Sequence, residues 1–119
     1  MLSVQIFGLK NSQSTRAAER FFKERSVGIH FVDLKQKPMS PGEINRFIQR
    51  FGLKGILDDS GKAWEDAGLK YLKVSDSELL GRIERDPRLL RLPLVRAGGK
   101  LAIGHDAAGW AAMLETPTK

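Results

Sequence analysis

A polar run near the N-terminus holds the residues of this chain that are best placed for chemistry. It separates a strand-like segment from a helix-like one, and the first amide groups of a helix can hold a sulfate, phosphate or carboxylate. The candidate anion-binding residues are Asn11, Ser12, Gln13, Ser14, Thr15 and Arg16, with Lys10 just before them. The simpler alternative is that these side chains only cap the helix and contact water.

Cysteine is absent from all 119 residues. The thiolate is the nucleophile of thiol redox chemistry and a ligand of zinc and iron–sulfur sites, so those functions are excluded within this chain. Only two histidines, His30 and His105, are present, and we expect no metal site and no cofactor. A serine such as Ser12 needs an adjacent base before it can attack a substrate, and neither histidine is its neighbour in the sequence.

Length and charge limit the class of protein. A chain of 119 residues is the size of one domain and can bury a core without a disulfide or a metal. The net charge is +6, but the basic residues alternate with Asp and Glu, which favours an ordinary solvated surface over a nucleic-acid site. We find neither a membrane-spanning apolar run nor a signal peptide, and therefore expect a cytoplasmic protein without membrane contact.

The elements that flank the polar run follow from hydrophobic patterning. Alternation over Ser3 to Phe7 predicts a strand. Apolar residues at helical spacing after Thr15 predict an amphipathic helix that reaches Val27 and ends at Gly28. Ile29 to Leu34 predicts a second strand. A strand, a helix and a strand in this order predict a βαβ unit with two parallel strands.

The middle of the chain is predicted to be helical. Ser40, Pro41 and Glu43 carry the signature of a capped helix start. Ser75 begins another helix, which ends before Pro87. The helices between residues 40 and 86 then form an insertion between two strand-containing segments.

The C-terminal part is predicted to form a hairpin and a helix. Leu92 to Ala97 and Leu101 to Ile103 are apolar strands, and Gly98-Gly99 between them is a two-residue hairpin signal. Asp106 caps the last helix. The order β-α-β, helices, β-β-α predicts an α/β domain with a mixed sheet of about four strands.

Three stretches resemble the arsenate-reductase-like family, which includes the ArsC, Spx and YffB proteins. Gly8-Leu9-Lys10-Asn11-Ser12 is similar to the run Gly-Ile-Lys-Asn-Cys that is common in YffB-like members. The loop from Gly55 leads to Trp64 and Glu65, as in the family. Residues 86–95, followed by Ile103-Gly104-His105, resemble the Leu-Leu-Arg-Arg-Pro run and hairpin of Spx-type proteins. The resemblance implies a single thioredoxin-like domain over residues 1–119 with a helical insertion at roughly residues 40–86.

The same resemblance assigns roles to single residues. Ser12 stands where the family has its reactive cysteine, and Pro93 is implied to be a cis-proline that faces the Ser12 loop. Arsenate reductases have an arginine immediately before this proline; here the arginine is Arg91, one residue earlier. One step along a strand reverses the direction of a side chain, so this arginine is displaced. The positions near Ser60 and Gly104 also lack family arginines, so no catalytic residue of the family is intact.

Two functional hypotheses follow from these observations. The first is a redox-inactive family member that acts as a binding or regulatory module; Spx-type relatives bind RNA polymerase, which is the protein partner that the resemblance implies. The second is an arsenate-reductase-like or glutathione-linked oxidoreductase whose thiols all come from a partner or substrate. A small anion at the Ser12 loop fits either hypothesis. Nucleic-acid binding is not expected, because no recognised motif is present and the phenylalanines have the helical spacing of core residues.

Overall fold

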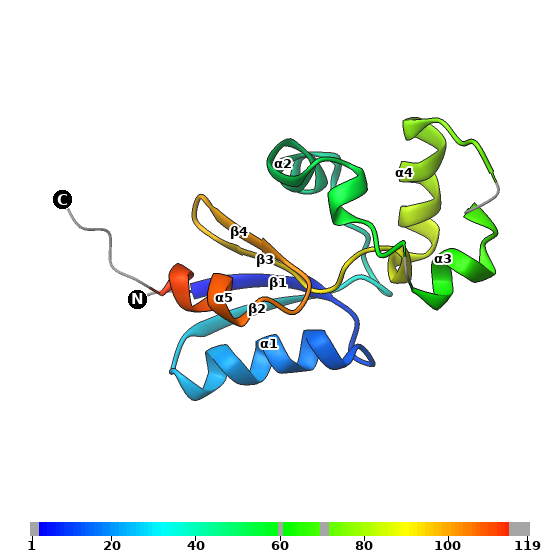
Figure 1. The fold of residues 1–119 in the computed structure, drawn as a ribbon. Coiled ribbons are helices and arrows are strands. Elements are labelled where there is room, and N and C mark those ends of the chain that lie inside the picture. The colour runs from blue at the N-terminus through cyan, green and yellow to red at the C-terminus, as the bar shows by residue number, and fades with distance from the viewer. Residues whose placement is uncertain (1–2, 60, 70–71, 115–119) are drawn as a thin grey trace. The chain divides into compact units, whose positions relative to one another are not determined.

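The computed structural model describes residues 3–59, 61–69 and 72–114 (Figure 1). The chain divides into two compact units. Met1–Asp33 together with Leu92–Lys119 form the sheet unit, and Leu34–Arg91 form the helical unit. The helices predicted between residues 40 and 86 all fall in the helical unit. Within the described ranges, no helix has the length and apolar character needed to cross a membrane.

The sheet unit contains a mixed four-stranded sheet with the strand order β2-β1-β3-β4. β1 pairs in parallel with β2, whereas β1 with β3 and β3 with β4 are antiparallel. Its elements are β1 (Ser3–Gly8), α1 (Gln13–Glu24), β2 (Gly28–Asp33), β3 (Leu94–Ala97), β4 (Lys100–Ile103) and α5 (Ala107–Met113). The predicted βαβ unit, hairpin and final helix are confirmed, and with them the α/β class.

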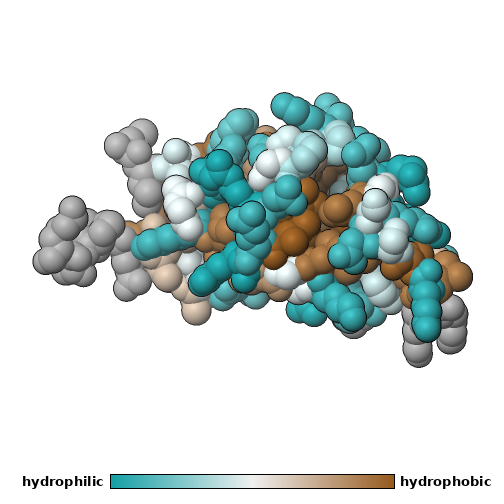
Figure 2. All heavy atoms as spheres, turned by 90° about the horizontal axis from the view of Figure 1, so that it is seen from above, coloured by the Kyte–Doolittle hydropathy of each residue, from teal (hydrophilic) through white to brown (hydrophobic). Residues whose placement is uncertain are grey.

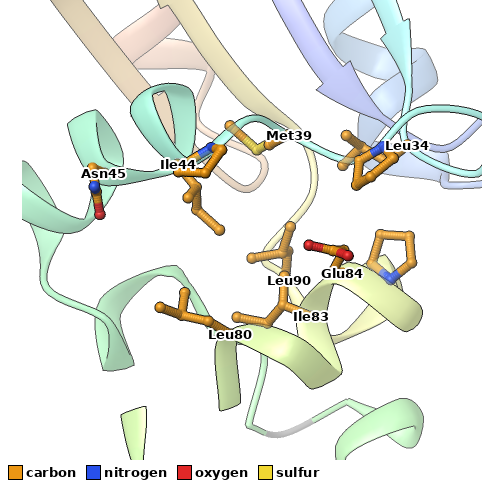
Figure 3. A pocket seen from close by; sticks show the side chains of 11 residues that line it. Leu34, Met39, Ile44, Asn45, Leu80, Ile83, Glu84 and Leu90 are labelled. Carbon is orange, nitrogen blue, oxygen red and sulfur yellow. The ribbon is translucent and has the colours of Figure 1, made fainter. Parts of the chain in front are cut away.

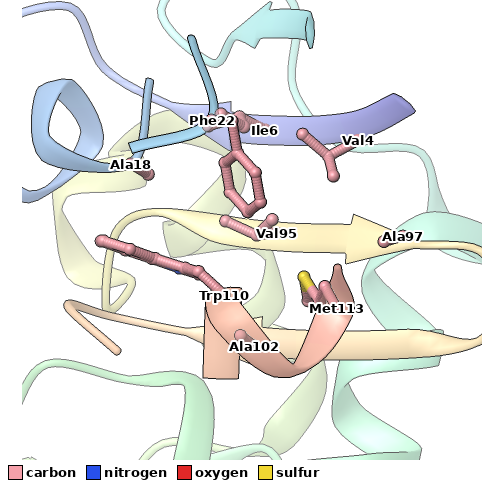
Figure 4. Close-up of a cluster of buried hydrophobic side chains, with 9 residues drawn as sticks. All are labelled: Val4, Ile6, Ala18, Phe22, Val95, Ala97, Ala102, Trp110 and Met113. Carbon is pink, nitrogen blue, oxygen red and sulfur yellow. The ribbon is translucent and has the colours of Figure 1, made fainter. Parts of the chain in front are cut away.

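One hydrophobic cluster holds the sheet unit together (Figure 4). It joins side chains from β1, β3 and β4 to side chains from α1 and α5, so both helices cover the same face of the sheet. The cluster comprises Val4, Ile6, Ala18, Phe22, Val95, Ala97, Ala102, Trp110 and Met113. Phe22 and Trp110 are its largest members, with ring centroids 6.3 Å apart. Each fully buried side chain of this size stabilises the fold by about 1.5–3 kcal/mol.

Helix α1 ends earlier than the sequence predicts. The prediction that it reaches Val27 and stops at Gly28 is wrong, because the helix ends at Glu24 and Gly28 begins β2. Ser26 adopts a left-handed φ of 57°. Its amide donates to the carbonyl of Lys23 and the amide of Val27 donates to the carbonyl of Phe22, at 3.1 and 3.0 Å. These two bonds form a Schellman motif, in which a serine takes the place that glycine usually occupies.

The hairpin and the final helix use the residues that the sequence singled out. Gly98 has a φ of 62° in the turn between β3 and β4, a conformation that glycine adopts without strain. The Asp106 carboxylate accepts a hydrogen bond from the amide of Gly109 at 2.9 Å and caps α5. A Cβ at Gly109 would press against the Asp106 carboxylate, so a side chain there would require this carboxylate to shift.

The helical unit is built from short helices. They are α2 (Pro41–Phe51), the 3₁₀ turn η1 (Lys54–Ile56), α3 (Lys62–Asp66), α4 (Asp76–Arg85) and the 3₁₀ turn η3 (Pro87–Leu89). The predicted capping box is confirmed: the Ser40 hydroxyl accepts from the Glu43 amide at 3.2 Å, and the Ser40 amide donates to the Glu43 carboxylate at 3.0 Å. The Ser75 hydroxyl caps α4 in the same way.

A short ladder closes the helical unit. Leu57 and Leu90 form an isolated antiparallel bridge. The Asp58 amide donates to the carbonyl of Leu89 at 2.8 Å, and the Arg91 amide donates to the carbonyl of Ile56 at 2.9 Å. The segment before α3 is thereby joined to the segment after α4. The bridge was not predicted, because it joins residues more than 30 positions apart. The two 3₁₀ turns were not predicted either, although their hydrogen bonds are local.

Candidate functional site

The loop from β1 to α1 is shaped by one close approach. Thr15 is fully buried, with 0% of its surface exposed. A Cβ added to Gly8 would lie 2.5 Å from the Thr15 hydroxyl oxygen, far inside contact distance. Gly8 therefore lets the first turn of α1 pack directly on the end of β1. This packing fixes where the helix begins.

Ser12 is the N-cap residue of α1. Its hydroxyl oxygen accepts a hydrogen bond from the Thr15 amide at 3.2 Å, and its carbonyl accepts from the Arg16 amide at 3.0 Å. The Ser12 amide donates back to the carbonyl of Leu9 at 3.0 Å, which closes the turn. Among the described residues, no side-chain base bonds to the Ser12 hydroxyl. The arrangement is that of a helix cap rather than an activated nucleophile.

A shallow hollow lies beside this cap on the surface of α1. Three of the predicted anion-binding residues line it, together with three residues that the prediction did not include. The lining side chains are Gln13, Ser14, Arg16, Ala17, Arg20 and His105. Asn11, Ser12 and Thr15 do not line it. The structure thus separates the six candidates into three that border the hollow and three that build the loop.

Arg16 and Arg20 give the hollow its positive charge. They are four residues apart on α1 and so project from the same side of the helix. No carboxylate forms an ion pair with either guanidinium within the described part of the chain, and the first turn of α1 carries no acidic residue. The helix dipole adds positive character at the same end. The hollow is therefore suited to an anion, and the i, i+4 spacing of the two arginines was the sequence signal for Arg20.

The two histidines lie in different places. His105 is exposed, borders the hollow and packs its ring edge-on against Trp110 at a centroid distance of 5.2 Å. His30 lies on β2 opposite Gln5 of β1, three residues before β2 ends at Asp33. No local pattern in the sequence could place His105 beside α1, because the two segments are about 90 positions apart.

Pro93 lies at the end of the sheet where β1 ends. Phe7 pairs with Leu94, so extending the antiparallel register by one residue places Pro93 opposite Gly8. The Leu92–Pro93 peptide bond is cis. The Pro93 carbonyl accepts a hydrogen bond from the Gly104 amide at 3.0 Å. That this proline faces the Ser12 loop as in the family stays a prediction.

At the positions for which the resemblance implies arginines, this chain has other residues or an arginine shifted by one position. The guanidinium Nε of Arg91 donates to the carbonyl of Leu57 at 2.8 Å, which makes it part of the ladder of the helical unit. Gly104 has a φ of 68°, and an arginine at that position would take this conformation only with strain. Ser60 lies outside the described residues. In the part of the chain that the structure describes, no group of three or more His, Cys, Asp or Glu side chains could hold a metal ion.

Comparison with known proteins agrees with this fold. The model of the ArsC family matches residues 7–113. The chain belongs to the ArsC family. It is similar to a protein named arsenate reductase from Neisseria meningitidis serogroup A, with 26% identity over 117 residues, which cover 96% of this chain and 100% of the relative.

Regulators and solved structures are also among its relatives. The global transcriptional regulator Spx 2 of Oceanobacillus iheyensis is 24% identical over 106 residues, which cover 87% of this chain and 78% of the relative. The solved structure of an arsenate reductase from Vibrio cholerae superposes with a TM-score of 0.79 at 17% identity, covering 95% of this chain and 98% of that one. This likeness shows that the two proteins share a fold. This ArsC-family chain has the family fold but contains no cysteine.

Proposed function

We propose that this protein is a redox-inactive member of the ArsC family that works as a binding or regulatory module. The observation that carries the proposal is Ser12, a serine at the helix start whose hydroxyl caps α1 in a chain without any cysteine. A helix N-terminus lowers the pKa of a thiol enough to make a thiolate. A serine hydroxyl is far less acidic, and the same helix end cannot ionise it near neutral pH.

The arginines support the same conclusion. Arg91, the displaced arginine, donates to the carbonyl of Leu57, and the residue before Pro93 is a leucine. A loss of the thiol alone would be compatible with a conservative change at one position. Loss of the thiol together with the change of the neighbouring arginine is better explained by loss of the redox function.

A protein is the partner that fits this proposal best. Several relatives are named global transcriptional regulator Spx, and RNA polymerase is the partner that this analogy implies, in a cytoplasmic protein. The test is co-elution of the purified chain with RNA polymerase from its source cell in size-exclusion chromatography. The proposal predicts a complex that Arg16→Glu weakens and that Lys23→Glu, a charge reversal elsewhere on α1, leaves intact. If neither RNA polymerase nor any other protein co-purifies across repeated conditions, the regulatory proposal fails.

The Ser12→Cys variant tests whether the start of α1 still favours a thiolate at the position that the resemblance assigns to the family cysteine. The new thiol would sit at the N-cap of α1, where the amide of residue 15 and the helix dipole favour the thiolate. We expect its pKa to fall clearly below the value of about 8.5 for a free cysteine, as measured by thiolate absorbance against pH. A pKa near 8.5 would mean that the electrostatic environment of the family site has been lost as well.

An alternative is an oxidoreductase whose thiols all come from a partner or substrate. The observation in its favour is the arsenate reductase of Neisseria meningitidis, which this chain matches over 100% of that protein's length. In this alternative, Arg16 and the α1 amide groups would hold the oxyanion while glutathione supplied the thiol. Turnover of arsenate with glutathione and glutaredoxin separates the alternative from the main proposal.

Anion binding at the Ser12 loop is compatible with both proposals. Arg16 and Arg20 support it, because they line the hollow at the start of α1 and no carboxylate of the described residues forms an ion pair with them. We expect sulfate or phosphate to raise the melting temperature of the protein, because a ligand that binds the folded state stabilises it. Arg20→Ala should reduce this rise, and Lys23→Ala, which removes a cation from the last turn of the same helix, should not. If both substitutions reduce the rise equally, the anion stabilises the protein by general charge screening and not by binding at the hollow.

A further inference from the structure

The helical unit contains a cavity that the proposed function does not use. It lies between the loop before α2, the first turn of that helix, α4 and η3 (Figure 3). Its volume is about 180 Å³. An apolar protein cavity of ~150 Å³ takes up benzene, so this cavity has room for one six-membered ring or a short branched aliphatic group. All of its lining residues belong to the helical unit.

The walls of the cavity are apolar and largely preformed. Leu34, Ile83 and Leu90 are buried at its base, and Met39, Ile44 and Leu80 are half-buried around it. Pro38, Pro41 and Pro87 complete the wall. A proline has a fixed φ, so these parts of the wall are pre-organised and lose little entropy when a ligand binds. Apolar side chains also reach the surface on the face shown in Figure 2, where brown atoms are bordered by teal ones.

One carboxylate faces this apolar space. Figure 3 shows the side chain of Glu84 turned toward the cavity beside Leu90. Lys and Arg side chains form ion pairs with Glu24, Asp66, Glu78 and Asp86. No Lys or Arg side chain of the described residues forms an ion pair with Glu84. Asn45 is the other polar residue of the wall. An apolar cavity that holds a single unpaired negative charge is complementary to an apolar ligand with one positive charge.

We propose that this cavity binds a small apolar amine, that is, a ring or short branched aliphatic group attached to a protonated amino group. The apolar group fills the space between Ile44, Leu80 and Ile83, and the ammonium group pairs with the Glu84 carboxylate. The apolar contact provides most of the affinity, as is usual for small-molecule sites. The ion pair with Glu84 makes the site prefer a positively charged ligand to a neutral one, because hydrogen bonds between ionised groups are stronger than those between neutral groups.

The test is an NMR titration of the ¹⁵N-labelled full chain with three ligands of similar shape. These are 2-phenylethylamine, the neutral 2-phenylethanol and the anionic 3-phenylpropionate. We expect the amine to shift the amides of Ile44, Leu80 and Ile83 with a dissociation constant on the order of millimolar, the range for a ligand of about nine heavy atoms. The alcohol should bind about threefold to fivefold more weakly, as expected for one partly exposed ion pair, and the carboxylate more weakly still.

Two substitutions on α4 make the test specific. Glu84→Gln should reduce the preference for the amine over the alcohol to less than about twofold. Glu78→Gln removes the same charge from the same helix, but Glu78 pairs with Arg82 and does not line the cavity. It should leave the preference unchanged. Glu84 is exposed, so its substitution is not expected to prevent folding.

Three results would overturn the proposal. The first is equal binding of the amine, the alcohol and the carboxylate, which would remove the role of the Glu84 charge. The second is the absence of shifts at the cavity amides with all three ligands. The third is stronger binding at these amides by an apolar peptide without a basic group, which would make the cavity a protein-docking surface. None of these outcomes depends on Ser12 or on partner binding by the sheet unit.

Discussion

The Ser12 loop of the sheet unit, which joins β1 to α1, and the cavity of the helical unit are formed by different interactions. The loop is held by backbone hydrogen bonds, a helix cap and the contact of Gly8 with the fully buried Thr15. The cavity is surrounded by apolar side chains and contains one carboxylate that no cation neutralises among the described residues. The loop is therefore required by the fold whether or not it performs chemistry. The shape of the loop is therefore no evidence of chemistry there, whereas nothing in the packing requires a charge at Glu84.

Under the proposed function, a loop that also starts a helix keeps its shape after its reactive group is lost, because the cap and the close packing contribute to stability. Ser12 forms the hydrogen bond of an N-cap residue, which is a structural role that needs no catalysis. The stability of variants in the loop and in the core beneath it measures how much of the loop is structural.

The largest effect is expected in the core that supports the loop. Phe22→Ala should lower the free energy of unfolding by about 3–5 kcal/mol, because the ring is fully buried and its loss leaves a cavity. Urea denaturation followed by circular dichroism measures the change. Leu72→Ala is the control: that side chain is 48% exposed, and its loss should change the free energy by less than about 0.5 kcal/mol. A small effect of Phe22→Ala would mean that the cluster under α1 is loosely packed.

A smaller but more specific effect is expected at Gly8. Gly8→Ala places a methyl group against Thr15 and should cost about 1–3 kcal/mol through overpacking. The double variant with Thr15→Ala should recover part of this loss, because the methyl and hydroxyl groups that clash are then absent. A double-mutant cycle of urea denaturation curves measures the coupling. Additive effects would contradict the direct contact.

The buried hydroxyl of Thr15 gives a prediction of the opposite sign. Its oxygen has no hydrogen-bond partner among the described residues, and a buried unpaired polar group destabilises a protein. Thr15→Val keeps the shape and removes the hydroxyl. We expect the free energy of unfolding to stay unchanged or to rise by about 1–2 kcal/mol, as measured by thermal and urea denaturation. A loss of more than 1 kcal/mol would show that the hydroxyl is hydrogen-bonded in the folded protein.

Removal of the Ser12 cap should cost about 1 kcal/mol. Ser12→Ala loses the bond to the Thr15 amide, whereas Ser12→Asp keeps an acceptor there and adds a charge that the helix dipole favours. Differential scanning calorimetry should therefore rank the melting temperatures with Ser12→Ala lowest. If Ser12→Asp is as unstable as Ser12→Ala, the hydroxyl does not act as a cap.

The smallest effect is expected at Asp86 in the helical unit. Hydrogen bonds from the Arg88 side chain hold the pKa of Asp86 below its ordinary value of 3.8. Because the pKa is lowered in the folded state, the stabilisation is complete above about pH 3.8 and is lost as the pH falls through the lowered pKa. Asp86→Asn should destabilise the protein by a few tenths of a kcal/mol at pH 7, and this difference should disappear in strong acid.

The sequence predicted the parts of the fold that depend on neighbouring residues. The Ser40 capping box, the Asp106 cap and the turn at Gly98 each involve residues within four positions, so composition and spacing were sufficient. The end of α1 was predicted wrongly, because serine rarely adopts the left-handed conformation that Ser26 takes. No local pattern distinguishes Ser26 from other serines, whereas Gly28 carried the usual signal for a helix end.

Less of the candidate site could be predicted, because its geometry depends on distant segments. The run from Asn11 to Arg16 was found from its polar character and its place before a helix. The burial of Thr15 could not be foreseen, since it results from the packing of α1 against Gly8. The position of His105 beside the hollow depends on how the loop between β4 and α5 approaches α1. The cavity next to Glu84 required the packing of two helices that are separated by more than 20 residues.

Arsenate turnover by the unmodified protein tests the central claim most directly. The purified chain is incubated with arsenate, glutathione and glutaredoxin, and arsenite is quantified beside matched reactions with Ser12→Ala and without protein. A redox-inactive family member should form arsenite at the same rate as the two controls. Turnover above background that disappears in Ser12→Ala would contradict this account, because it would show that the Ser12 loop still performs the chemistry of the family.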